Sequence, residues 1–98
     1  MSQEFKTITT VTIAEEEYRI EIEKALYTVL ESARANENCL WCELHVDFKN
    51  PHTYICVDAW KSLEAILAHQ QSAPFRHFTD VIAHKVTDFQ LNAIERVY

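Results

Sequence analysis

The order in which two hydrophobic periods alternate along this chain limits the folds open to it more than any other feature. Polar and apolar residues alternate in four segments, which predicts four strands over residues 5–14, 39–48, 52–60 and 86–97. Lys49-Asn50-Pro51 is a short turn signal, so the middle two strands should form a hairpin. Apolar residues at spacings of three and four, typical of amphipathic helices, fill the two remaining gaps.

The two helices are marked by their starts. Three acids, Glu15-Glu16-Glu17, suit the positive end of a helix dipole, and the apolar spacing that follows predicts a helix over about 15–35. Ser62 has a residue type preferred at an N-cap, here for a helix over 63–71 that Ser72-Ala73-Pro74 restarts. The order β-α-β-β-α-β predicts an α+β, ferredoxin-like fold, with one antiparallel four-stranded sheet and the helices on one face.

The length of 98 residues predicts one domain, residues 1–98. On strand 39–48, one face carries Trp41 and the other carries Leu40, Cys42, Leu44, Val46 and Phe48. On strand 52–60, the face opposite Tyr54 is apolar at Ile55, Val57 and Ala59. A sheet that is apolar on both faces needs cover on both, and the helices cover only one. A second copy of the sheet is the simplest cover, so we expect a homodimer built sheet against sheet.

The charge balance argues against two classes of partner. Fifteen acidic residues outnumber nine basic ones, which gives a net charge of −6, and the basic residues are scattered. Nucleic acids and anionic membranes need clustered Lys and Arg, so neither is expected as a partner. The N-terminal segment has no signal-peptide pattern, no apolar run approaches the roughly 18 residues that span a bilayer, and three cysteines fit a reducing compartment. We therefore expect a cytoplasmic protein.

The spacing of cysteines and histidines does not favour a metal site. Cys39 and Cys42 have the spacing of a redox or zinc pair, but residues three apart on a strand point to opposite faces. Their sulfurs should therefore not share one ion, and we interpret them as unrelated core or half-buried residues. None of the five histidines has the i, i+4 spacing of a helical ligand pair. The spacing therefore predicts no metal site, and the absence of glycine excludes phosphate-cradling loops.

Candidate chemistry gathers in residues 54–78. His69 lies beside the helix break at Pro74, where a neutral imidazole can accept or give a proton near neutral pH. The alternative for His69 is a helix-end residue that bonds nearby carbonyls. Asp58 shares a strand face with two aromatic residues, which makes it a candidate general base within a pocket. The alternative for Asp58 is a solvated or capping carboxylate at a strand end.

Three segments resemble the antibiotic biosynthesis monooxygenase family. They are Glu37-Asn38-Cys39-Leu40, the run 58–65 with Asp58, Trp60, Ser62 and Ala65, and the run 68–75 with His69, Ser72 and Phe75. The resemblance covers nearly the whole chain and implies ferredoxin-like protomers that pair through their sheets into a dimeric α+β barrel. The chain departs from the family at Asp58, where Glu is usual, and at Asn38, where Gly is usual and Asn should keep a left-handed turn.

Activities in that family include cofactor-independent oxygenation of quinols and polyketide phenols, haem degradation, and isomerisation of a small carbonyl compound. Haem degradation is disfavoured, because that branch has Trp where this chain has His69 and a haem-ligating His where it has Thr79. The resemblance thus implies a homodimeric monooxygenase that uses O₂ and no cofactor on a quinol or other electron-rich aromatic. The alternatives are a non-catalytic small-ligand-binding dimer and an isomerase.

Each candidate residue has an expected role in such an enzyme. His69 would handle the proton, and Asp58 would orient His69 or the substrate. Four aromatic side chains are large and apolar enough to exclude water around a flat ring, so they should line the pocket: Tyr54, Trp60, Phe75 and Phe78.

Overall fold

The computed structural model describes residues 4–98, so the first three residues of the segment inspected for a signal peptide lie outside it. The elements in order are β1 (Phe5–Ile13), the 3₁₀ helix η1 (Glu16–Tyr18), α1 (Arg19–Arg34), β2 (Cys39–Val46), β3 (Thr53–Trp60), α2 (Leu63–Gln70), α3 (Ala73–Ile82) and β4 (Val86–Glu95). The predicted order of strands and helices is confirmed.

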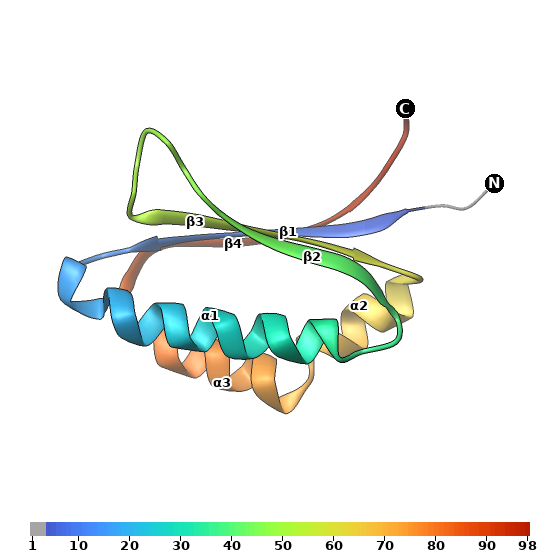
Figure 1. Cartoon of the computed structure of the whole chain (residues 1–98), viewed down its shortest axis with the longest axis horizontal. Coiled ribbons are helices and arrows are strands. Elements are labelled where there is room, and N and C mark those ends of the chain that lie inside the picture. The colour runs from blue at the N-terminus through green and yellow to red at the C-terminus, as the bar shows by residue number, and fades with distance from the viewer. Residues whose placement is uncertain (1–3) are drawn as a thin grey trace.

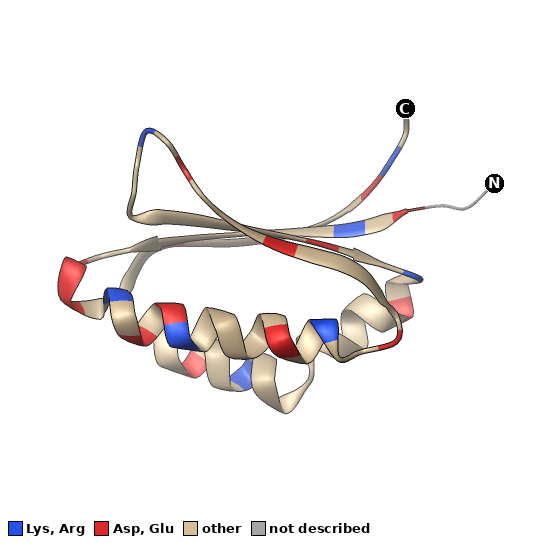
Figure 2. Ribbon diagram, viewed as in Figure 1, with Lys and Arg blue, Asp and Glu red and all other residues tan. Residues whose placement is uncertain are grey.

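The four strands form one antiparallel sheet in the order β2-β3-β1-β4. All helices lie on one side of this sheet, and the other side is open (Figure 1). This is the ferredoxin-like α+β arrangement that the sequence predicts. In Figure 2 the basic residues of the described chain lie singly among acidic ones. No helix within residues 4–98 is long and apolar enough to cross a membrane.

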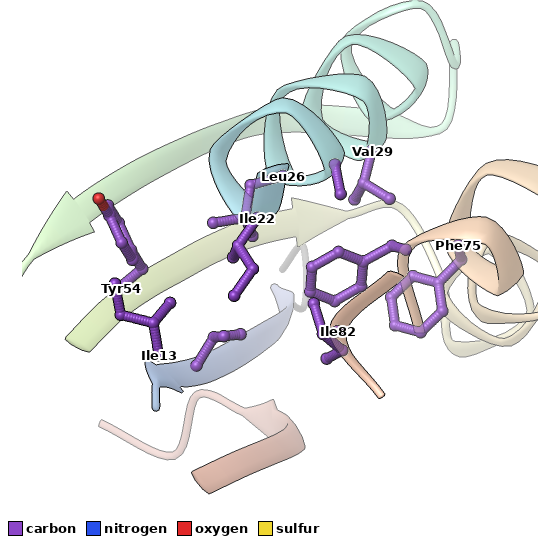
Figure 3. Packing of buried hydrophobic residues seen from close by; sticks show 10 residues of the cluster. Ile13, Ile22, Leu26, Val29, Tyr54, Phe75 and Ile82 are labelled. Carbon is purple, nitrogen blue, oxygen red and sulfur yellow. The ribbon is translucent and has the colours of Figure 1, made fainter. Parts of the chain in front are cut away.

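Strand alternation sets which residues enter the core between the sheet and the helices. The odd-numbered residues of β1 from Thr7 onward are buried, and the even-numbered ones are partly exposed. On α1, buried residues recur at spacings of three and four from Ile22 to Ala33. Figure 3 shows the resulting cluster, in which Ile22, Leu26 and Val29 of α1 meet Ile13 of β1 and Phe75 of α3.

The two-piece second helix follows from its caps. The Ser62 hydroxyl accepts a hydrogen bond from the Ala65 amide at 3.1 Å, and the Ser72 hydroxyl accepts one from the Phe75 amide at 3.4 Å. Pro74 lies in the first turn of α3, where its missing N–H costs nothing. The predicted starts of α2 and α3 are therefore confirmed.

A β-bulge in β2 changes which residues of that strand share a face of the sheet, so part of the prediction for this strand is wrong. Cys39 pairs with Trp60 and Trp41 pairs with Ala59, so Leu40 is an extra residue without its own partner on β3. Leu40 is consequently 51% exposed and does not share the buried face of Cys42. The strand also ends at Val46, which leaves Phe48 fully exposed beyond it.

The expected left-handed turn at Asn38 is also wrong. Within residues 4–98 the only residue other than glycine with a positive φ is His84, at 64° in the turn from α3 to β4. The turn after α1 is made instead with side-chain help, because the Asn36 amide oxygen accepts a hydrogen bond from the Asn38 backbone N–H at 2.9 Å.

Two isoleucines on α1 test how the core stabilises the fold. Ile22 is completely buried and Ile20 is 70% exposed. Ile22→Ala should lower the free energy of unfolding by about 2–5 kcal/mol, because it removes buried contacts and leaves a cavity. Ile20→Ala, the matched control, should change it by less than about 0.5 kcal/mol. Urea unfolding followed by circular dichroism measures both, and equal losses would contradict the described orientation of α1.

Candidate active site

A small cavity lies between the sheet and the three helices. Its volume is about 20 Å³, enough for one water molecule. One side is apolar and comes mainly from α1 and α3: Leu26, Val29, Leu30, Phe75, Phe78 and Leu91. The other side carries hydrogen-bonding groups from β1, β3 and the end of α2: Thr7, Thr9, Cys56, Asp58, His69 and Gln70. The cavity therefore combines an apolar lining with a few convergent polar groups, as small-molecule sites do.

Asp58 is the acidic group of this cavity. Its side chain faces the helices from β3 and is only 5% exposed. Burial raises the pKa of the Asp58 carboxyl, because a charge is costly away from water, and the Cys56 hydrogen bond, the nearby His69 and Thr7 oppose that rise. The Cys56 thiol donates to Asp58 Oδ1 at 3.1 Å. The carboxyl is thus held in place by its own strand.

His69 is the second titratable group of the cavity. It lies at the C-terminal end of α2 and is 6% exposed. Burial lowers the pKa of the His69 imidazole, and the nearby Asp58 carboxyl opposes this shift. The Nε2 atom of His69 is buried without a hydrogen-bond partner in the described structure. An unsatisfied buried nitrogen costs about 1–3 kcal/mol, and Trp60 Nε1 next to it is likewise buried without a partner.

Aromatic rings hold the imidazole on both sides. The Trp60 ring lies at 4.7 Å from the His69 ring, centroid to centroid, and the Phe75 ring meets it edge-on at 5.6 Å. Phe78 continues the contact from Phe75 at 5.9 Å. Because Trp60 is fully buried, this packing fixes the orientation of the imidazole beside the cavity.

The structure brings most of the predicted site residues together. Asp58, His69, Phe75 and Phe78 line the cavity, and Trp60 packs directly behind His69. Tyr54 does not join them. Figure 3 shows Tyr54 at the opposite end of the core cluster from Phe75.

The Tyr54 hydroxyl belongs to a separate polar network at the start of α1. It donates to Glu23 Oε2 at 2.6 Å and accepts from Arg19. Arg19 also donates to both carboxylate oxygens of Glu16 and to the Pro51 carbonyl. This network ties the β2–β3 turn to the helix layer and gives Tyr54 a structural contact in place of the predicted pocket position.

Several cavity residues were missed by sequence reasoning. Thr7 and Thr9 share the buried face of β1 with Val11, and hydroxyls on an otherwise apolar face are a readable sign of a polar cavity. Cys56 likewise shares the face of Asp58. No such sign marks the α1 residues or Gln70, because their position depends on how the helices pack. Within residues 4–98 no group of three or more His, Cys, Asp or Glu side chains is placed to hold a metal ion.

The pKa shift of His69 predicts a pH effect on stability. Below its ordinary pKa of 6.5 the unfolded chain takes up a proton that the folded imidazole resists, so the free energy of unfolding should fall as the pH drops. The fall is at most about 1.4 kcal/mol per pH unit. His69→Gln should remove this slope, whereas the exposed control His77→Gln should retain it. Urea unfolding between pH 7.5 and 5.5 measures the difference, and identical slopes in all three proteins would contradict a buried neutral His69.

Several solved structures share this fold. A Pseudomonas aeruginosa protein aligns with a TM-score of 0.87 and 23% identity, over 100% of this chain and 98% of its own. A Mycobacterium tuberculosis protein aligns with a TM-score of 0.87 and 12% identity, over 97% and 96%. A structure named antibiotic biosynthesis monooxygenase aligns with a TM-score of 0.85 and 21% identity, over 96% and 99%. At these identities the likeness concerns the fold.

The sequence itself carries the family relationship. No curated protein matches this chain. The family pattern described as antibiotic biosynthesis monooxygenase, however, matches residues 5–81, which run from β1 to the end of α3 and include both Asp58 and His69. This chain belongs to the antibiotic biosynthesis monooxygenase family.

Proposed function

We propose that this protein is a cofactor-independent monooxygenase that acts on a quinol or another electron-rich aromatic small molecule. The observation that carries the proposal is that His69, with its buried and unpartnered Nε2, and the buried Asp58 carboxyl line the same cavity. Family membership supports the reaction class. A reduced aromatic such as a quinol supplies all four electrons that O₂ takes up, so no separate reductant is required.

The first step of the proposed reaction is a proton transfer. A substrate hydroxyl donates its proton to His69 Nε2, which burial keeps in the neutral, accepting form. The Asp58 carboxylate stabilises the imidazolium that results, and Thr7 and Thr9 offer hydroxyls to the substrate anion. The electron-rich anion then reduces O₂ directly. For a hydroquinone the products are the hydroxylated quinone and one water molecule, which balances all atoms of quinol and O₂.

The cavity must widen to admit such a substrate. A cavity of about 150 Å³ takes up benzene, whereas this one measures about 20 Å³. Gln70 and Ser72 are partly exposed and flank the break between α2 and α3. We therefore place the opening at this break, where a small shift of α3 moves Phe75 away from His69.

We also propose that the protein is a homodimer formed through the open face of the sheet. That face is apolar at its centre, where Val57 of β3 lies beside Ile8 of β1, and Trp41 extends it across β2. A protein of this size gains stability when such a face is covered. The candidate site lies on the helix side, so a dimer of this kind leaves it accessible.

Oxygen uptake tests the proposed reaction. Purified protein without added cofactor should consume O₂ with at least one member of a panel of hydroquinones and naphthols. His69→Gln should lower kcat/KM about 100-fold or more, because a general base contributes roughly that much, and should leave substrate binding within a few-fold. His77→Gln, on the exposed side of α3, should retain full activity.

Two other outcomes would replace the proposal. Product without O₂ consumption would indicate an isomerase. Tight binding of aromatics with no product, affected only modestly by His69→Gln, would indicate a ligand-binding protein.

A charged substitution tests the dimer. Val57→Arg places a guanidinium at the centre of the open face, where burial of an unpaired charge costs several kcal/mol, so the protein should become monomeric. Leu67→Arg is the control, because Leu67 is exposed on α2 and should leave the dimer intact. Sedimentation velocity distinguishes the two states. A Val57→Arg protein that stays folded and dimeric would place the interface elsewhere.

A further inference from the structure

The bulge in β2 changes the relation between Cys39 and Cys42. On a regular strand, residues three apart point to opposite faces and lie about 10 Å from each other. Here Cys39 pairs with Trp60 and Cys42 pairs with Asp58, and both partners face the helices. Paired residues on neighbouring strands share a face. The two cysteines therefore lie on the same side of the sheet, contrary to the expectation from the sequence.

The register brings the two cysteines near the range of a disulfide. Asp58 and Trp60 are two residues apart on β3, which is roughly 6.6–6.8 Å along an extended strand. Their partners Cys42 and Cys39 should be about as far apart, and this is the upper end of the Cα separation of about 4.4–6.8 Å seen in disulfides. The Cβ atoms of a disulfide lie about 3.5–4.5 Å apart, so closing the bond requires the backbone to tighten at the bulge.

The positions of the sulfur atoms agree with this backbone argument. Cys39 Sγ donates to the carbonyl of Trp41, the residue before Cys42, at 3.4 Å. Each of the two thiols also influences the pKa of the other, as groups that lie close together do. Cys42 Sγ additionally donates to the Leu30 carbonyl at 3.8 Å. All three cysteines are free thiols.

The third cysteine is less well placed. Cys56 lies diagonally across from Cys42, because its partner on β2 is Leu44. Diagonal neighbours are about 7–8 Å apart, which exceeds the disulfide range. The Cys56 thiol is moreover held by Asp58 Oδ1. Cys39 is therefore the better partner for Cys42.

We propose that Cys39 and Cys42 form an intramolecular redox pair that closes to a disulfide across the β2 bulge in the presence of a peroxide. Cys39 is the half-buried member, so its thiolate attacks the O–O bond, becomes a sulfenic acid and releases the first water once a proton is added. The Cys42 sulfur then attacks the Cys39 sulfur and releases a second water. Two thiols are oxidised, and one hydrogen peroxide is reduced to two water molecules.

The environment of the pair makes this reaction slow at neutral pH. Burial raises the pKa of Cys39 to about 11 and also raises the pKa of Cys42, although Arg34 beside Cys42 opposes the shift. Thiolate is the reactive form, so below that pKa the oxidation rate of the folded pair should rise about tenfold for each unit by which the pH is raised. In urea, where cysteine returns to a pKa near 8.5, the same pair should oxidise much faster at pH 8.

Mass spectrometry of the oxidised chain tests the proposal. Dilute native protein is treated with hydrogen peroxide at pH 8 and at pH 10, then unfolded and alkylated. The expected product has lost two hydrogen atoms, carries one alkyl group on Cys56, and contains Cys39 and Cys42 in one disulfide-linked peptide. It should form much faster at pH 10. This mapping on the wild type does not depend on whether any variant folds.

Single substitutions locate the bond. Cys56→Ser should leave the disulfide unchanged. Cys39→Ser should abolish it, and Cys42→Ser should trap Cys39 as a sulfenic or sulfinic acid, because no second thiol resolves it. A bond to Cys56, a bond between two chains, or three thiols that all remain alkylatable at pH 10 would each overturn the proposal. Oxidation of the native pair at pH 8 as fast as in urea would also overturn it.

Discussion

The burial of the Asp58 carboxyl between the sheet and the helices is the constraint on which the candidate site depends. An ionised carboxylate in this position is costly, so burial raises the pKa of Asp58, and the same environment lowers the pKa of His69. The carboxyl is therefore harder to ionise, and the imidazole harder to protonate, than in water. Each group offsets part of the other's shift, because a charge on one stabilises the opposite charge on the other.

The rest of the fold keeps this pair in position. Trp60, two residues beyond Asp58, is fully buried and packs its ring on His69, so one strand supplies both the carboxyl and the ring that orients the imidazole. The break between α2 and α3 ends α2 at Gln70, directly after His69, and the Ser72 hydroxyl donates to the His69 carbonyl at 2.6 Å. At the far end of β3 the contacts of Tyr54 with Arg19 and Glu23 hold the hairpin against α1. Contacts at both ends of β3 thus hold the strand that carries Asp58 against the helix layer.

Periodicity was sufficient for the element order and for the faces of β3, because both depend on local alternation that survives in the structure. Tyr54 shows where that reasoning stops. It does share a face with Asp58, but the two residues are four positions apart on the strand, roughly 13 Å, so a common face is not a common site. The bulge at Leu40 could not be predicted from the sequence either. One unpaired residue moves every earlier residue of the strand to the other face of the sheet, and the polar–apolar pattern does not show where this happens. The contribution of Leu26, Val29 and Gln70 to the cavity depends on helix packing, which no single segment encodes.

The raised pKa values of the three thiols matter because the proposed reaction uses O₂ close to them. Transfer of one electron to O₂ makes superoxide, and any that escapes the cavity becomes hydrogen peroxide. The thiols nearest to Asp58 are exposed to this product first, and Cys56 is hydrogen-bonded to that carboxyl. Burial keeps all three thiols protonated and hence slow to react. A low-pKa thiol in the same place would be oxidised during turnover. The dithiol across the bulge thus differs from a fast peroxide sensor. It should close only after sustained exposure to peroxide or after local opening of the β2 edge. Under both conditions the residues of the candidate site are also open to oxidation.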